Sequence, residues 1–300
     1  MDDIGIIYAV RGEKYLSEVY DSIKSVRSTN PEIPITIFSD INPENILQSE
    51  HNIDHIDISD ARFSKRPKID CLLQTPYKKT LYLDSDTYVQ GDLKNIFEFL
   101  DGYDFVCKCQ EQNYEWSHKS SEDKEFPGGI SNEEEFRERL DMNTPRMMPD
   151  YNSAVVAYNM NERTRELLNT WGSIYEKHLE IPGYFRDQPA LRKAIFETDV
   201  KVGGSLPPEC NFSIRKLYGS RGLNRKIRQR PLIMHGRSHN KEKAIENINK
   251  RVESRGYIIK HKSIIDEIFE KGWILSKSIY YNGWGPTFSK LKSFIKRKIR

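Results

Sequence analysis

Short apolar runs alternate with segments of helical periodicity through the first third of the chain. Residues 4–10 form a continuous apolar run, and the apolar residues that follow it recur at helical spacing, as Tyr15, Leu16, Val19, Ile23 and Val26. Further strand-like runs lie at 35–40, 53–58, 81–89 and 104–109. This alternation predicts an α/β domain with a mixed, mainly parallel sheet and helices on both faces. A sheet of this kind binds ligands at the carboxyl ends of its strands.

Local signals place two helices between these runs. Pro67 suits the first turn of a helix that carries Ile69 and Leu72 on one face. Asp92 is positioned to cap an amphipathic helix over residues 93–100.

The pattern changes after residue 109. Residues 110–150 are polar and predict one helix, where Ser131 and Glu134 form a capping box. Such an insertion forms either a lid or a surface excursion, and the sequence leaves both open. The elements predicted beyond it are a strand at 153–159, a long helix through Trp171, a short helix that begins at Asp187, a strand that passes into a loop within 231–238 and a helical extension over 241–300.

The bulk composition is typical of a folded protein with reduced thiols. The 300 residues are 37% hydrophobic and 30% charged, which excludes disorder for most of the chain. The formal net charge of +3 is too small to indicate nucleic-acid binding. Four cysteines without a CxxC pair indicate reduced thiols, mostly in the core. Since the sequence shows neither an apolar stretch of about 18 residues nor a secretory signal, we expect a cytoplasmic protein.

Two segments concentrate positive charge. Residues 213–230 contain seven Lys and Arg residues and no acid, which predicts a mobile basic loop. Residues 290–300 contain six basic residues and no acid, and apolar residues recur at near-helical spacing from Phe288 to Ile299. This pattern predicts that residues 285–300 lie on an anionic membrane surface. A solvated basic terminus, or one packed on the core, fits the same composition.

The most informative segment is Asp84-Ser85-Asp86, directly after the apolar residues Leu81 to Leu83. Where the chain turns at the end of a strand, both carboxylates can approach one hard divalent cation, Mg²⁺ or Mn²⁺. Such a cation would bridge the diphosphate of a nucleotide and neutralise the charge that grows on it as it leaves. A loop-start cap is the simpler interpretation of the same triplet.

Residues 79–97, KTLYLDSDTYVQGDLKNIF, resemble the DxD segment of nucleotide-sugar glycosyltransferases with the GT-A fold, most closely glycosyltransferase family 8 and its relatives. The resemblance runs in order through 4–10, 66–77, 151–159, 186–191, 205–212 and 231–236. It implies a Rossmann-like GT-A domain over 1–240. Residues 1–109 would be the nucleotide-binding half, 110–150 the insertion or lid, and 151–240 the acceptor and sugar half.

The resemblance also implies an activity: metal-dependent transfer of a sugar from a nucleotide-diphosphate sugar to an acceptor hydroxyl, with retention at the anomeric carbon. A UDP-sugar is the favoured donor, and a glycan, a lipid-linked molecule or a protein the acceptor. If the enzyme inverts instead, Asp150 or Asp187 could serve as the general base.

Site residues follow from the matching positions. The resemblance implies that Asp84, Asp86 and His235 are the metal ligands. The residues at the sugar are Asn152, Asp187 and Gln188. The residues at the nucleotide and its phosphates are Tyr8, Ala9, Val10, Arg11, Lys68, Asp84, Ser85, Gly236, Arg237 and Lys241. Ala154 departs from the family, which usually has Gly there, and the spacing after His235 leaves Arg237 and Lys241 as alternatives for the phosphate-binding cation.

Each of these residues also has a purely structural interpretation. His235 could be a core histidine, Asp187 a helix cap, Lys68 a solvated helix residue, and Asn152 part of a turn.

Three other functions compete with glycosyl transfer. LYLDSDTYV also fits the signature of haloacid-dehalogenase phosphatases, in which Asp84 would be the nucleophile. That motif belongs on the first strand, however, and no late acidic pair completes its Mg²⁺ site. A nucleotidyltransferase would need a Gly-rich loop after the first strand, and Tyr8 to Gly12 does not form one. A non-catalytic sugar-nucleotide-binding protein remains the third alternative.

Overall fold

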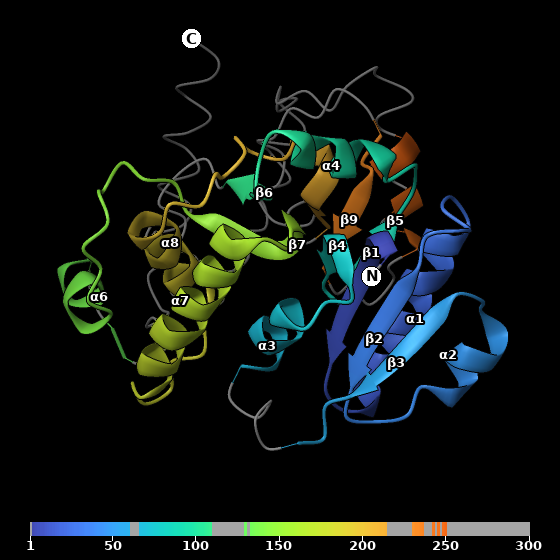
Figure 1. Ribbon diagram of the computed structural model, residues 1–300, viewed down its shortest axis with the longest axis horizontal. Coiled ribbons are helices and arrows are strands. Elements are labelled where there is room, and N and C mark those ends of the chain that lie inside the picture. The colour runs from blue at the N-terminus through green and yellow to red at the C-terminus, as the bar shows by residue number, and fades with distance from the viewer. Residues whose placement is uncertain are drawn as a thin grey trace, which may run out of the picture.

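A six-stranded sheet forms the centre of the computed structural model (Figure 1). The structure describes residues 2–60, 66–109, 129–130, 133–214, 230–236, 242–243, 245–246 and 248–250. The strands are β1 Asp2–Val10, β2 Ile35–Ser39, β3 Ile53–Asp57, β4 Tyr77–Leu83, β6 Phe105–Cys109 and β7 Tyr151–Asn159. Their order is β3-β2-β1-β4-β7-β6. Only β7 runs against the others in this sheet, because it pairs antiparallel with both β4 and β6, so the predicted mainly parallel sheet is confirmed.

Helices cover both faces of this sheet, as the sequence pattern predicts. One face packs against α1 Glu13–Arg27, α2 Glu44–Ser49 and α4 Lys94–Glu98. The other packs against α3 Pro67–Leu73, α7 Glu162–Leu179 and α8 Gln188–Glu197. Strand β1 shows why both faces are apolar: Ile6 and Val10 belong to the first core, and Ile7 to the second. A strand buried on both faces therefore appears in the sequence as a continuous apolar run.

A second, smaller sheet lies beside the first. It consists of β5 Thr87–Val89, β9 Ile233–His235 and β8 Phe212–Ser213, in the order β5-β9-β8. Residues 81–89, which the sequence presents as one strand-like run, are thus divided between two sheets. Two 3-10 helices complete the described elements of this region, η2 Phe99–Asp101 and η4 Pro208–Asn211. The division places the turn at Asp84 to Asp86 between the sheets.

One predicted cap differs in the structure. Helix α4 has Leu93, not Asp92, at its N-cap position. Asp92 lies one residue earlier, where its carboxylate accepts a hydrogen bond from the Lys94 N–H at 2.8 Å. The acid therefore still satisfies a backbone donor of the first turn.

The second part of the predicted insertion packs on α7 and α8. Helix α6 Glu133–Arg139 confirms the predicted helix. The segment that follows is held by two buried cations of α8: Arg192 pairs with Asp150 at 3.0 Å, and Lys193 with Asp141 at 2.6 Å. Residues 110–128 and 131–132 lie outside the described residues.

Several predictions fall on residues that the structure does not describe. These are most of the basic loop, the candidate phosphate ligands Arg237 and Lys241, and the C-terminal membrane helix. Across the ranges that are described, no helix combines the length and the apolar character needed to cross a membrane. Cys71, Cys107 and Cys210 are buried and Cys109 is half-buried, all as free thiols.

A buried histidine makes the stability of this fold depend on pH. Burial lowers the pKa of His178 to about 4, and its Nε2–H donates to the Leu140 carbonyl at 3.0 Å. The unfolded chain binds a proton on this ring near pH 6.5 but the folded chain does not, so a falling pH stabilises the unfolded chain relative to the folded one. We expect the free energy of unfolding to fall by about 2 kcal/mol between pH 7 and pH 5 through this residue alone.

Chemical denaturation at several pH values measures this effect. His178→Gln retains an amide donor for Leu140 but does not titrate, so it is the matched control. The prediction is wrong if the wild type and His178→Gln lose stability with the same pH dependence.

Candidate functional site

The DxD segment forms a tight turn at the carboxyl end of β4. The Asp84 N–H donates to the Ala154 carbonyl at 2.9 Å, which is the last hydrogen bond between β4 and β7. Beyond it, both the N–H and the hydroxyl of Thr87 donate to the Asp84 carbonyl, at 3.2 and 2.9 Å. The turn is therefore closed on itself, and it directs the side chains of Asp84, Ser85 and Asp86 to the ligand-binding edge of the sheet.

Tyr8 supports this turn from inside the protein. It is fully buried, and its hydroxyl lies 2.9 Å from the Ser22 hydroxyl, which lies 2.7 Å from that of Thr87. Because Thr87 donates to Asp84, it accepts from Ser22, which in turn accepts from Tyr8. Strand alternation points this ring into the α1 side of the core, so a nucleotide could meet Tyr8 only at its backbone, and the predicted contact stays a prediction.

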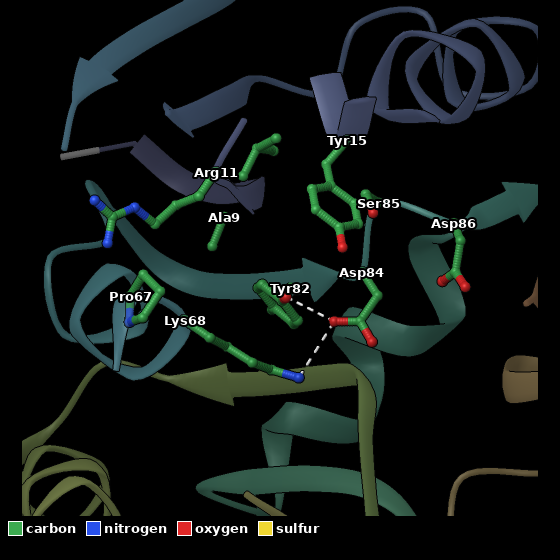
Figure 2. Close-up of a pocket in the computed structure, with 10 residues that line it drawn as sticks. Ala9, Arg11, Tyr15, Pro67, Lys68, Tyr82, Asp84, Ser85 and Asp86 are labelled. Carbon is green, nitrogen blue, oxygen red and sulfur yellow. Dashed lines mark hydrogen bonds and ion pairs between the residues drawn. The ribbon is translucent and has the colours of Figure 1, made fainter. Parts of the chain in front are cut away.

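A cavity of about 340 Å³ opens at this edge of the sheet, in the size range of small-ligand sites. Its lining residues are Ala9, Val10, Arg11, Tyr15, Pro67, Lys68, Tyr82, Asp84, Ser85 and Asp86 (Figure 2). Six of the residues predicted from sequence to bind the nucleotide lie in this lining, namely Ala9, Val10, Arg11, Lys68, Asp84 and Ser85.

Arg11 lies at the rim of the cavity and extends away from Asp84 and Asp86 (Figure 2). Its Nε is 3.5 Å from the Asp40 carboxylate, which also accepts the Gly12 N–H at 2.9 Å. Gly12 has a φ of +85°, a conformation that glycine adopts without strain. Asp40 therefore shapes the loop between β1 and α1 that forms this wall.

Lys68 lies at the centre of the site. Its Nζ donates to the Ser153 carbonyl at 2.6 Å, to the Ser153 hydroxyl at 3.0 Å and to Asp84 Oδ1 at 3.2 Å. It is also 3.6 Å from Asp187 Oδ2 and lies over the ring of Tyr82. Burial lowers the pKa of Lys68, but the carboxylates of Asp84 and Asp187 outweigh burial and raise it above its ordinary value.

This geometry excludes the interpretation of Lys68 as a solvated helix residue, since its side chain is only 20% exposed. An ammonium has three N–H donors, and the contacts to Ser153 and Asp84 already use them. Contact between Lys68 and a nucleotide stays a prediction, and it requires one of these hydrogen bonds to be exchanged.

Asp187 faces the site and does not cap its helix. It occupies the N-cap position of α8, but its side chain makes no capping hydrogen bond. Its carboxylate accepts from the Ser153 hydroxyl at 3.0 Å, and its carbonyl accepts from the Trp171 indole N–H at 2.9 Å. The capping alternative for Asp187 is therefore wrong, because contacts between distant parts of the chain orient the carboxylate. Gln188, the first residue of α8, is half-buried beside it.

Asn152 lies within β7, as its second residue, and not in a turn before that strand. Its Oδ1 accepts the Ala154 N–H at 2.9 Å, two residues along the chain. The same oxygen also accepts a hydrogen bond from Asn211 at 2.9 Å. The residue lies at the start of β7, and because β7 runs antiparallel to β4, that end lies at the carboxyl edge of the parallel strands.

The backbone brings the three predicted metal ligands together. His235 pairs with Thr87 between β9 and β5, and the Gly236 N–H donates to the Asp86 carbonyl at 3.2 Å. Within the described ranges, however, no three His, Cys, Asp or Glu side chains gather closely enough to form a metal centre. Figure 2 shows the reason at Asp84, whose carboxylate is turned toward Lys68 and Tyr82.

The donor set nevertheless fits a divalent cation. Two carboxylates and an imidazole are ligands that Mn²⁺ accepts, and carboxylates suit Mg²⁺. Both hydrogen bonds that the structure gives to the Asp84 carboxylate, from Lys68 and from the Tyr82 hydroxyl, fall on Oδ1. The second oxygen, Oδ2, is therefore the one suited to a metal.

Sequence reasoning missed Tyr82, which donates to Asp84 at 2.7 Å, and Tyr15, which lines the cavity. Ser153 belongs to the segment that the resemblance places at the sugar, but its role in joining Lys68 to Asp187 was not foreseen. Tyr82 could have been found, since strand alternation places it on the opposite face from Leu81 and Leu83, two residues before Asp84. No local signal marks Ser153 as the residue that bridges an ammonium and a carboxylate.

Solved structures resemble this chain in fold. No protein-family model matches the sequence, and no curated protein matches it either. The galactosyltransferase LgtC, in complex with donor and acceptor sugar analogs, superimposes with a TM-score of 0.54 at 15% identity, over 90% of this chain and 100% of that one. The bifunctional glycosyltransferase WbbM gives a TM-score of 0.57 at 17% identity, over 85% of this chain and 52% of that one.

Mouse xyloside xylosyltransferase 1 gives a TM-score of 0.53 at 13% identity, over 79% of this chain and 98% of that one. This chain has the GT-A glycosyltransferase fold. The GT-A fold predicted from the sequence is thereby confirmed, while membership of family 8 stays a prediction.

The shared ammonium predicts a stability effect. Lys68→Met leaves Asp84 and Asp187 without their common cation, in positions where their side chains are 35% and 23% exposed. We expect the variant to lose about 1–2 kcal/mol of unfolding free energy at neutral pH. Denaturant titration measures this loss.

The matched control is Lys78→Met, which removes an ion pair whose partners, Lys78 and Asp3, are 64% and 82% exposed. An exposed pair contributes little, so this control should lose less than about 0.5 kcal/mol. Equal losses in the two variants would show that Lys68 is not the link between the two carboxylates.

Proposed function

We propose that the chain is a metal-dependent glycosyltransferase that moves a sugar from a nucleotide-diphosphate sugar to an acceptor hydroxyl. One observation carries the proposal: the DxD turn borders a cavity at the strand ends of a GT-A fold, and Lys68 joins Asp84 of that turn to Asp187. The phosphatase alternative is disfavoured, because Asp84 follows β4 and not the first strand of the chain.

In this proposal Asp84, Asp86 and His235 hold Mn²⁺ or Mg²⁺. When bound, the cation supplies positive charge to the leaving diphosphate. Tyr82 and Lys68 fix the orientation of the Asp84 carboxylate through Oδ1. Preorganised charge of this kind supplies much of the rate of such reactions.

The nucleotide lies in the cavity beside Ala9, Val10 and Arg11. Tyr15 and Pro67 add aromatic and apolar surface for a base, and UDP is the nucleotide that the resemblance favours. Gly236, with Arg237 or Lys241, lies next to the phosphates in the same scheme. The basic loop 213–230 adds further positive charge.

The sugar lies toward Asn152, Asp187 and Gln188, and transfer proceeds with retention. The structure disfavours one of the two candidate bases for inversion, since Asp150 is 6% exposed in its side chain and paired with Arg192 at 3.0 Å, while Asp187, the other candidate, faces the site. The paired carboxylate of Asp150 is poorly placed to take a proton from an acceptor. The acceptor is a glycan, a lipid-linked molecule or a protein, and contact with an anionic membrane through residues 285–300 remains part of the proposal.

A screen of nucleotide sugars tests the activity directly. Each donor is incubated with the protein and Mn²⁺, and the release of free nucleoside diphosphate is measured with and without chelator. Release that needs the metal supports the proposal. Release of phosphate from simple phosphomonoesters, without any consumption of nucleotide sugar, would contradict it.

Asp86 gives the decisive variant. Asp86→Asn keeps the size of the side chain but removes one negative charge from the proposed metal site. We expect turnover to fall at least about 100-fold, which corresponds to about 3 kcal/mol of barrier. Asp101→Asn, at an acid that is 71% exposed and pairs with Lys79, is the matched control and should retain full turnover. A fully active Asp86→Asn would overturn the metal site.

A further inference from the structure

A buried asparagine from a distant segment contacts the predicted sugar-binding Asn152. Asn211 ends the 3-10 helix η4 and is fully buried. Its Nδ2 donates to Asn152 Oδ1 at 2.9 Å, and its backbone carbonyl accepts from the Lys108 ammonium at 2.7 Å. Lys108 is itself buried and pairs with Asn152 between β6 and β7. Segments from β6, β7 and η4 thus meet at Asn211, β6 at its backbone carbonyl and β7 at its side-chain amide.

These contacts fix the orientation of the Asn152 side-chain amide. Its Oδ1 accepts from two N–H donors, those of Ala154 and Asn211. Rotating the amide by half a turn would place its own NH₂ group against both donors, where no hydrogen bond can form. The Asn152 NH₂ group is therefore held on the other side, as a donor.

A second observation indicates that Asn211 does more than fill space. Among the residues that the structure describes, its Oδ1 has no hydrogen-bond partner, although the side chain is fully buried. A buried carbonyl without a partner costs stability, so an apolar residue would be the better choice if packing were its only role. The amide is used for its donor, and the recipient of that donor is Asn152.

We propose that Asn211 is a positioning residue, which locks Asn152 so that its NH₂ group faces the sugar of the donor. This inference rests on the proposed function, which places the sugar beside Asn152 and Asp187. Asn152 is adjacent to Ser153, whose hydroxyl donates to Asp187 at 3.0 Å, so the two sugar-facing residues are joined through the start of β7. Asn211 acts on the sugar only through Asn152, and it does not act on the nucleotide.

Binding of donors with and without the sugar tests this role. In Asn211→Asp a carboxylate oxygen replaces the NH₂ group and repels Asn152 Oδ1, so the Asn152 amide turns. We expect the affinity for the sugar nucleotide to fall at least about tenfold, and the affinity for the free nucleoside diphosphate to stay within about twofold. Calorimetry in the presence of Mn²⁺ measures both, with UDP-glucose, UDP-galactose, UDP-N-acetylglucosamine and GDP-mannose against UDP and GDP.

Asn30→Asp is the matched control. Asn30 is also buried, and its amide donates to the Gly91 carbonyl at 2.9 Å on the α1 side of the fold. This variant also buries a carboxylate in place of an amide, so it should lower stability without separating the two affinities. Asn211→Ala removes the hydrogen-bond donor without burying a charge. If Asn211→Asp does not fold, Asn211→Ala takes its place in the binding experiment.

A double-mutant cycle separates positioning from general destabilisation. In the Asn152→Ala background, Asn211→Ala should cause no further loss of sugar-nucleotide affinity. Additive losses, or an Asn211→Ala protein that binds the sugar nucleotide like the wild type, would overturn the proposal. If the wild type binds none of the nucleotides, the proposed function itself fails. That outcome differs from additive losses and from wild-type binding by Asn211→Ala, because in both of those the wild-type protein still binds nucleotide.

Discussion

One ammonium group, that of Lys68, connects the two halves of the candidate site. It lies 3.2 Å from Asp84 in the DxD turn and 3.6 Å from Asp187 at the start of α8. Without a cation between them, these two carboxylates would face each other at the edge of a buried sheet, where repulsion is weakly screened. The hydrogen bond from Lys68 to the Ser153 carbonyl adds β7 to the same point. The relative positions of β4, α3, β7 and α8 at this edge therefore depend on the charge of Lys68, which is 20% exposed.

The site is supported from both faces of the sheet. On the α1 side, the hydroxyls of Tyr8, Ser22 and Thr87 form a chain that ends on the Asp84 carbonyl. On the α7 side, the Trp171 indole holds the Asp187 carbonyl. The polar groups are thus oriented by partners that are themselves packed in the core, which is what a preorganised ligand site requires.

The sequence was sufficient for the strands and most helices of the main sheet and for the position of the DxD turn, because those features depend on local periodicity. It did not show that residues 81–89 are divided between two sheets. It was insufficient wherever a residue's partner lies far along the chain. Tyr8 belongs to a strand that is apolar on both faces, so the pattern could not tell which side meets a ligand. Asp187 occupies an N-cap position, and only its contacts with Ser153 and Lys68 show that the carboxylate turns into the site. The contact between Asn211 and Asn152 has no local signal at all.

The central claim is that this edge of the sheet binds a nucleoside diphosphate together with a divalent cation. Calorimetric titration of the wild-type protein with UDP, in the presence of Mn²⁺ and then of chelator, tests it most directly. The account predicts saturable one-to-one binding with Mn²⁺, weakened at least about tenfold when the metal is removed, because the cation neutralises the charge between diphosphate and carboxylates. UDP binding of equal strength with and without the metal, or no binding in either case, would contradict it.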